Sequence, residues 1–246
     1  MRWEEIPSVD VTRDDSGSTE LNSSSRAKII ALGRDDLGMS DIKVYFDYVC
    51  PYCLIAHENV RKFQAKYPAI GYDWKPWEIC PETPTEGIVL DFSCVSPTLA
   101  KLAEEAGFQI QSPSIQPNSH VALMSLFYAK ENGRLEQYNN AVFKALWEGS
   151  KNIGELTTMS RIIGEIGLDS KDYNRTMKNH RDKYAAMLEE SETDAIDDDI
   201  QLAPTFVFGD KQIIGNVSAR KIDRFIEKIA VSQQSQDDVG SRKKLQ

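Results

Sequence analysis

The order of apolar and polar positions predicts an α/β fold that begins near residue 42. Residues 42–48 (IKVYFDY) are rich in β-branched and aromatic side chains, which favours a short buried strand. A helical pattern starts at Pro51, a residue suited to the first turn of a helix, and ends at Pro68. Residues 70–79 (IGYDWKPWEI) then predict a second strand, interrupted at Pro76.

The middle of the chain, from Pro97 to about Leu188, has the helical period instead. Apolar side chains form four successive stripes, each followed by a glycine where such a helix would end. The stripes consist of Leu99, Leu102, Ala103 and Ala106; Val121, Met124, Phe127 and Tyr128; Tyr138, Val142, Phe143 and Leu146; and Leu156, Met159, Ile162, Ile163 and Ile166. Their simplest interpretation is a helical core.

The strand pattern returns near the C-terminus. Residues 204–208 (PTFVF) and 211–214 flank a Gly-Asp turn, and residues 218–229 predict an amphipathic helix. The order strand, helix, strand, helical block, two strands, helix predicts an α/β domain interrupted by an all-α insertion.

The same patterns set the predicted boundaries. We expect the first part of the α/β domain over residues 29–95, the helical insertion over 96–190 and the second part over 191–231. The polar ends, 1–28 and 232–246, are predicted to be disordered extensions, because they contain too few residues able to anchor a core.

Composition narrows the class of protein. Of 246 residues, 41% are hydrophobic and 27% charged, as in an ordinary water-soluble globular protein. The 29 Lys and Arg against 38 Asp and Glu give a net charge of −9, which argues against nucleic acid or anionic lipid as a partner. The longest nearly apolar run, 121–129, is about half of a membrane span. The first 25 residues lack the apolar core of a secretory signal, so we expect a cytoplasmic protein.

Four cysteines carry the candidate chemistry, and only Cys50 and Cys53 are close in sequence. In the cytosol such a pair is more often catalytic, redox-sensing or metal-binding than a structural disulfide. At the junction of a buried strand and a helix, the first sulfur lies where free amide groups and the helix dipole favour a thiolate. Cys50 is therefore the expected nucleophile, and Cys53 would attack the resulting mixed disulfide and close a Cys50–Cys53 disulfide.

Two other interpretations of this pair stay open. A zinc site would need two further ligands, and neither Cys80 nor Cys94 has a close companion. The pair could also be two buried thiols without a reaction. Cys80 and Cys94 could form a second disulfide or redox-linked pair, or could be separate unreactive thiols.

Nearby titratable residues have weaker signals. His57 lies seven residues after Cys50, about 10 Å along a helix, so we interpret it as structural. His120 and His180 have no recognisable catalytic context. Asp47, three residues before Cys50, could tune thiol ionisation or transfer a proton, or could serve as a turn or cap residue.

An acidic run precedes Pro204, and it would disfavour a Cys50 thiolate if it faced that residue. The alternative is a solvated helix face. The run comprises Glu189, Glu190, Glu192, Asp194, Asp197, Asp198 and Asp199.

Four stretches carry a resemblance to a known family: 47–56 (DYVCPYCLIA), 77–87 (WEICPETPTEG), 118–122 (NSHVA) and 203–208 (APTFVF). Over nearly all of residues 42–229 the chain resembles the DsbA-like branch of the thioredoxin superfamily, and more specifically the cytosolic FrnE-like oxidoreductases. The resemblance implies a thioredoxin-like fold with a large inserted helical domain.

The resemblance also implies the remaining site residues. Pro204 would be a cis proline facing the cysteine pair, although a strand-initiating proline is the plainer interpretation. The Ala203 backbone would then meet an extended substrate, with Pro51, Tyr52 and Thr205 as further substrate-binding positions.

The function so implied is thiol-disulfide exchange on protein or small-molecule substrates. No bound cofactor is expected, since no glycine-rich phosphate loop is present, and an external thiol such as glutathione or thioredoxin would regenerate the pair. One alternative is a glutathione-dependent isomerase or transferase of the hydroxychromene-carboxylate isomerase or kappa-class type. Those proteins typically have serine at the position of Cys50. The other is a non-enzymatic redox sensor or binding protein.

Overall fold

The structure is a computed structural model that describes residues 41–68, 70–90, 95–215, 218–226 and 228–229. The extensions expected at 1–28 and 232–246 lie outside these ranges, as does Cys94.

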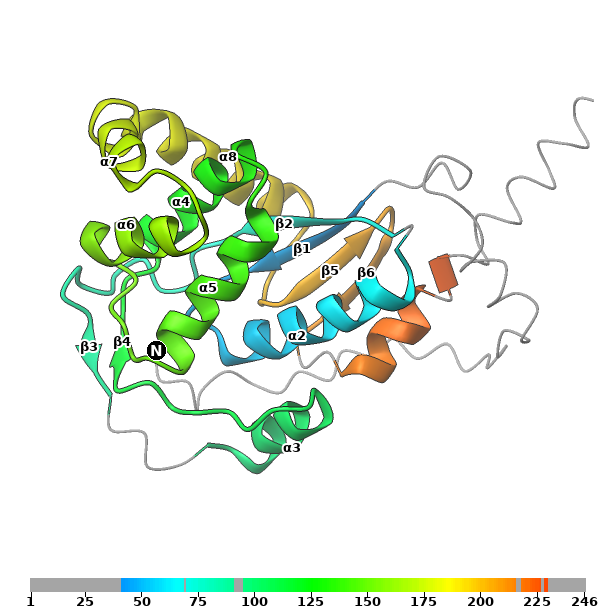
Figure 1. Cartoon of the computed structure of the whole chain (residues 1–246). Coiled ribbons are helices and arrows are strands. Elements are labelled where there is room, and N and C mark those ends of the chain that lie inside the picture. The colour runs from blue at the N-terminus through cyan, green and yellow to red at the C-terminus, as the bar shows by residue number, and fades with distance from the viewer. Residues whose placement is uncertain (1–40, 69, 91–94, 216–217, 227, 230–246) are drawn as a thin grey trace, which may run out of the picture.

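A four-stranded mixed sheet forms the centre of the molecule (Figure 1). Its strands are β1 (Ile42–Phe46), β2 (Tyr72–Pro76), β5 (Thr205–Phe208) and β6 (Lys211–Ile214), in the spatial order β2-β1-β5-β6. β1 and β2 are parallel, whereas β5 is antiparallel to both of its neighbours. β1 therefore has a partner on each side, and the loop that leaves it starts from the interior of the sheet.

Helices cover both faces of this sheet. α2 (Pro51–Lys66) and the helical residues 219–226 lie together on one face, where Tyr67 Oη donates to Asp223 Oδ1 at 2.9 Å. Side chains alternate along a strand, so Val44 of β1 joins the core on this side. Tyr45 faces the opposite side, where its cluster includes Ala195, Ile200 and Val207.

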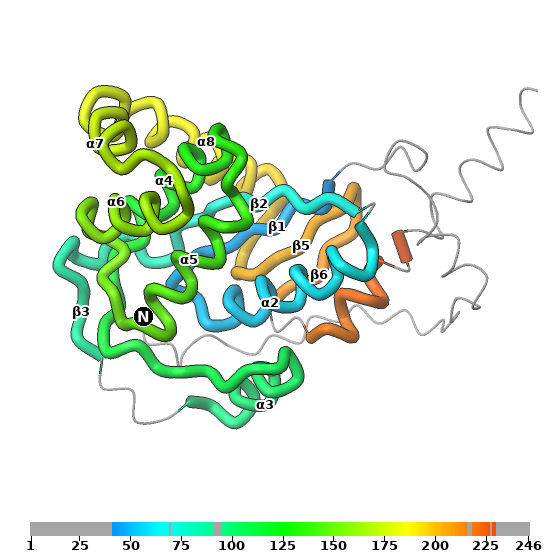
Figure 2. The backbone as a smooth tube through the Cα atoms, viewed as in Figure 1, coloured from blue at the N-terminus to red at the C-terminus, as the bar shows by residue number. Residues whose placement is uncertain are grey.

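A block of helices lies between β2 and β5 in the chain (Figure 2). Its helices are α3 (Pro97–Glu105), α4 (His120–Glu131), α5 (Leu135–Trp147), α6 (Leu156–Glu165), α7 (Ser170–Asn179) and α8 (Arg181–Asp197). The four stripes fall on α3, α4, α5 and α6, and most of their residues are buried.

The helical period expected from Pro97 onward is interrupted between α3 and α4. There β4 (Ile115–Gln116) pairs antiparallel with β3 (Ile88–Val89), and the hydrophobic pattern predicts neither of these two-residue strands. Pro113 and Pro117 flank this strand, and proline lacks the amide hydrogen that a helix interior needs.

The last helix of the block, α8, continues to Asp197, past the predicted end of the helical insertion at residue 190. The buried face of the helix proceeds through Tyr184, Leu188, Ser191 and Ala195. Its last two members are small residues that do not register as an apolar stripe. Ser191 Oγ donates to the carbonyl of Pro76 at 2.8 Å, so the second half of α8 covers the sheet.

Within the described ranges, no helix has both the length and the apolar content needed to cross a membrane.

Candidate active site

The site forms where β1 gives way to α2. After β1 ends, the residues 47–49 turn the chain, and Cys50 N donates to the Asp47 carbonyl at 3.2 Å. Cys50 is the N-cap of α2, and its own carbonyl accepts from Cys53 N and Leu54 N at 3.1 and 3.2 Å. Pro51 occupies the first helical position, where the missing amide hydrogen costs no bond. The predicted strand–cysteine–helix junction is present.

Cys50 and Cys53 are both buried and are free thiols. Burial raises the pKa of Cys53 well above its ordinary value, and hydrogen bonding to Cys50 raises this pKa further. The Cys50 thiol lies 3.5 Å from the carbonyl oxygen of Ala203, on a loop 153 residues later in the chain. The expected nucleophile and the loop before Pro204 are thus in contact.

The Pro204 loop is held by the sheet. The Ala203–Pro204 peptide bond is cis, as the resemblance implied. Gly215 N donates to the Pro204 carbonyl at 2.8 Å, and Thr205 lies opposite Tyr45 in the β1–β5 ladder. Because β5 pairs with β1, the loop that precedes β5 comes to the end of β1 where the cysteines lie.

The other expected substrate-binding residues differ in exposure. Thr205 has no exposed side-chain surface, and its hydroxyl donates to the Leu202 carbonyl at 2.6 Å. Its side chain therefore shapes the loop instead of facing a substrate. Pro51 is buried, whereas Tyr52 is half-buried and packs against the cluster of Ile55 with α3.

Asp47 is the buried carboxylate of the site. Its Oδ2 accepts from Ile79 N at 2.9 Å and from Ser119 Oγ at 3.0 Å, and its Oδ1 accepts from Val49 N at 3.2 Å. Burial nevertheless raises the pKa of Asp47 to about 7, and the charge of Glu78 contributes to the rise. Asp47 is a turn residue, as one interpretation held, and it also titrates near neutral pH.

The helical block holds the turn from the other side. Trp147 Nε1 donates to the Tyr48 carbonyl at 2.9 Å, and Tyr48 Oη donates to Asn139 Oδ1 at 2.6 Å. Ser119, just before α4, supplies the bond to Asp47. No local pattern marks Trp147 or Asn139 as part of the site, whereas Ser119 lies in the family-like stretch 118–122.

His57 is structural, as expected. It is buried, its Nε2 lies 2.8 Å from Asn140 Oδ1, and its ring stacks on Phe143 with centroids 4.9 Å apart. Burial lowers the pKa of His57, so the ring is neutral at physiological pH.

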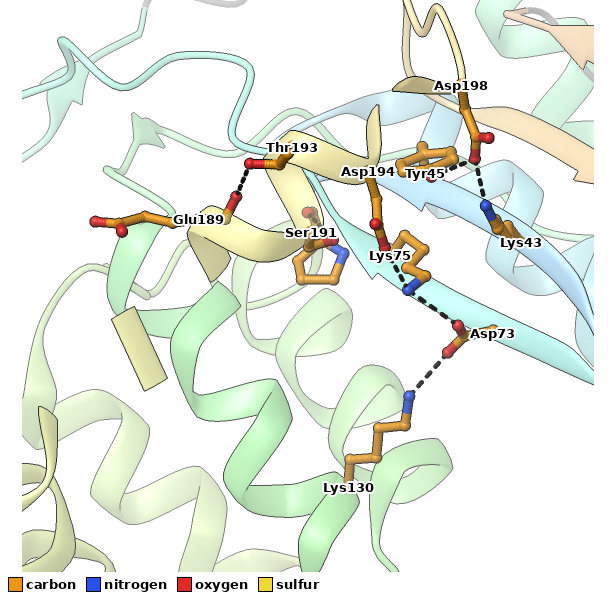
Figure 3. Close-up of polar contacts among 11 residues, drawn as sticks. Lys43, Tyr45, Asp73, Lys75, Lys130, Glu189, Ser191, Thr193, Asp194 and Asp198 are labelled. Atoms are coloured by element: carbon orange, nitrogen blue, oxygen red, sulfur yellow. Dashed lines mark hydrogen bonds and ion pairs between the residues drawn. The ribbon is translucent and has the colours of Figure 1, made fainter. Parts of the chain in front are cut away.

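The acidic run does not surround Cys50 as a unit. Figure 3 shows two of its carboxylates at the sheet face opposite α2. Asp194 pairs with Lys75 at 2.8 Å, and Asp198 accepts from Lys43 and Tyr45 at 2.7 and 2.5 Å. These contacts pair two carboxylates of the run over β1 and β2, whereas Glu189, Glu190, Asp197 and Asp199 are exposed, as the solvated-face interpretation expected.

Cys80 lies near the site without a sulfur partner among the described residues. It is a half-buried free thiol whose pKa is raised to about 11 by burial and by Asp47. The second disulfide considered for Cys80 and Cys94 involves a residue outside the described ranges. Across those ranges we find no cluster of three or more His, Cys, Asp or Glu side chains that could hold a metal ion.

A mixed sheet with a cysteine pair at a helix start and a cis proline opposite defines a thioredoxin-fold protein. The DSBA-like thioredoxin domain matches residues 41–227, and the chain belongs to this DsbA-like family. Among curated proteins, the uncharacterized protein YwbO of Bacillus subtilis is 29% identical over 182 residues, 71% of this chain and 89% of YwbO.

Solved structures share the fold at low identity. The probable DsbA oxidoreductase SCO1869 from Streptomyces coelicolor matches with a TM-score of 0.67 and 16% identity, over 77% of this chain and 89% of its own. A 2-hydroxychromene-2-carboxylate isomerase matches with a TM-score of 0.60 and 16% identity, over 82% of this chain and 98% of its own. The cytosolic disulfide reductase DsbM from Pseudomonas aeruginosa, solved with GSH, matches with a TM-score of 0.57 and 12% identity, over 80% of this chain and 98% of its own. At these identities the likeness shows the fold alone.

Proposed function

We propose that the protein is a thiol-disulfide oxidoreductase that exchanges disulfides through Cys50 and Cys53. The observation that carries the proposal is the position of both thiols at the start of α2, with the Cys50 sulfur 3.5 Å from the Ala203 carbonyl beside Pro204. Membership of the DsbA-like family supports the same chemistry.

The reaction has two exchange steps. The Cys50 thiolate attacks one sulfur of a substrate disulfide, and the other substrate sulfur leaves as a thiolate and takes up a proton. The Cys53 thiolate then attacks the Cys50 sulfur and displaces the second substrate sulfur, which is protonated in turn. Two electrons pass to the substrate, and the Cys50–Cys53 disulfide forms. Run in reverse, the same steps oxidise a dithiol.

The second step needs a base, because burial strongly favours the protonated form of Cys53. Asp47 is suited to this task. Its charge acts on Cys53, and with a pKa of about 7 it can accept and release a proton near neutral pH. In this proposal Asp47 takes the Cys53 proton as Cys53 attacks the mixed disulfide.

The substrate is an extended protein segment or a small disulfide placed along the Ala203 backbone. Main-chain hydrogen bonds at such a loop give affinity with little dependence on the substrate side chains. Tyr52, half-buried beside Cys53, would contact the substrate at its edge. An external thiol reduces the pair, and the likeness to the cytosolic DsbM, solved with GSH, supports glutathione and a cytoplasmic location.

The test is turnover of an insulin disulfide by the purified full-length chain with glutathione or thioredoxin as reductant. Cys50→Ser should abolish turnover, whereas Cys53→Ser should accumulate a mixed disulfide at Cys50 that mass spectrometry detects. Cys80→Ser is the matched cysteine control and should retain turnover. Equal activity of wild type and Cys50→Ser would refute the proposal.

The same experiment separates the alternatives. Stoichiometric oxidation of the pair with negligible turnover would indicate a redox sensor. The isomerase shares the fold, so a glutathione-dependent isomerisation that survives Cys53→Ser would favour that class, because such a reaction needs no second cysteine.

A further inference from the structure

Residues 77–79, which include the Asp47 donor Ile79, make a hydrogen bond through each of their three backbone amides. Trp77 N donates to the Phe46 carbonyl at 2.9 Å, and Ile79 N donates to Asp47 Oδ2 at 2.9 Å. Between them, the backbone amide of Glu78 bonds to the carboxylate of Glu192 from α8. This member of the acidic run therefore does reach the neighbourhood of the site.

Ser119, another donor to Asp47, directly precedes His120, which bonds to Glu78. Ser119 Oγ bonds to Asp47, and the following residue, His120, bonds through Nδ1 to Glu78 Oε2 at 2.9 Å. Ile79 and Ser119 thus each donate to Asp47, while their sequence neighbours Glu78 and His120 bond to each other. The ion pair joins the two segments that provide the donors to Asp47 Oδ2, whereas Val49 N donates to Oδ1.

Exposure decreases along this set of residues. The side chain of His120 is 38% exposed, that of Glu78 is 7% exposed, and Asp47 has no exposed surface. The second carboxylate oxygen of Glu78, Oε1, is buried and has no hydrogen-bond partner. A buried carboxylate with an unpaired oxygen depends on its one cationic partner for compensation of its charge.

We propose that the Glu78–His120 ion pair is a positioning and charge-compensating device that couples the protonation of Asp47 to that of His120 near the surface. This inference rests on the proposed function, because it assigns a control element to the base of the second exchange step.

The charges around the pair give the coupling its sign. His120 faces Glu78, Glu192 and Arg181, and its hydrogen bond to Glu78 raises the pKa of His120 above 6.5. When His120 is protonated, its charge offsets that of Glu78. When His120 loses its proton, the uncompensated Glu78 anion makes Asp47 hold its own proton more strongly. Of the surrounding groups, Glu192 adds to the negative charge and Arg181 opposes it.

The test is the titration of Asp47, followed by carbon NMR of the labelled carboxyl group in the reduced full-length protein. His120→Asn keeps a donor at the Nδ1 position but removes the cation, and it should raise the Asp47 midpoint by about 0.5 to 1. Glu78→Gln should lower the midpoint, because the charge of Glu78 raises the pKa of Asp47. In the Glu78→Gln background, adding His120→Asn should change nothing further. His180→Asn, at an exposed histidine, is the matched control.

The pH profile of mixed-disulfide resolution by Cys53 should move in the same direction as the Asp47 midpoint in each variant. An unchanged midpoint in folded His120→Asn, or a rise in Glu78→Gln, would overturn the inference. These NMR readouts do not require turnover. Refutation of the proposed function would appear separately, as disulfide exchange that persists in Cys50→Ser.

Discussion

Replacing Asp47 by asparagine should make the protein more stable at alkaline pH. In the native state the Asp47 carboxyl, whose pKa is about 7, keeps its proton up to that pH, whereas in the unfolded chain it loses the proton near 3.8. Between these values the native state binds more protons, so the wild-type free energy of unfolding decreases as pH rises. The loss is complete above about pH 7.

The magnitude follows from the difference between the two pKa values. At about 1.4 kcal/mol for each tenfold change in proton affinity, the shift from 3.8 to about 7 corresponds to roughly 4 kcal/mol at pH 8. Asparagine can keep its oxygen at the Oδ2 position, where Ile79 and Ser119 donate. Its amide would face Val49 N, and the loss of that hydrogen bond costs about 1 kcal/mol. A net gain of about 3 kcal/mol is expected.

The assay is urea unfolding of the reduced protein from pH 4 to 8. Asp47→Asn should match the wild type within about 1 kcal/mol near pH 4 and exceed it near pH 8. Asp197→Asn, at an exposed carboxylate, is the control and should change stability by less than about 0.5 kcal/mol throughout. An Asp47→Asn curve parallel to the wild-type curve over this range would refute the reasoning, because it would mean that Asp47 is ionised in the native state.

Three further substitutions test contacts around the site, each by urea unfolding. Trp147→Phe leaves the buried Tyr48 carbonyl without its donor and should cost about 2 kcal/mol; an unchanged midpoint would mean that water replaces the indole. Thr205→Val removes the bond to the Leu202 carbonyl and should cost about 1 to 2 kcal/mol, with Thr205→Ser as the control that restores it. Lys75→Met breaks the bridge between two carboxylates in Figure 3 and should cost about 1 kcal/mol in low salt and less in 1 M salt; an equal cost in both would point to lost packing instead.

The sequence predicts best the features that depend on neighbours in the chain. The Cys50 junction follows from a strand pattern, a C-x-x-C spacing and Pro51, all within a dozen residues, and the structure places them as expected. The stripes of the helical block are likewise local. α8 extends past its predicted end because its last buried positions are Ser191 and Ala195. A pattern of large apolar residues does not detect such small side chains.

Residues that support the site from a distance could not be predicted in this way. Ser119 reaches Asp47 across 72 positions, and Trp147 reaches Tyr48 across 99. The sequence around Ser119 and Trp147 does not indicate either bond, because a serine before a helix is usually an N-cap and a tryptophan near apolar residues usually belongs to the core. The family-like stretch 118–122 draws attention to Ser119 but does not predict that its hydroxyl bonds to Asp47.

These long-range bonds make the helical insertion part of the site. Two of the three donors to the Asp47 carboxylate come from the α/β domain, but the third, Ser119, belongs to the start of α4. α5 adds the bonds of Trp147 and Asn139 to Tyr48. A buried carboxyl with a pKa near 7 is costly for the fold, and without these bonds the same burial would raise its pKa further. Ser119 of the insertion therefore makes Asp47 easier to ionise, and in the proposed mechanism this helps Asp47 accept the proton of the buried Cys53 thiol.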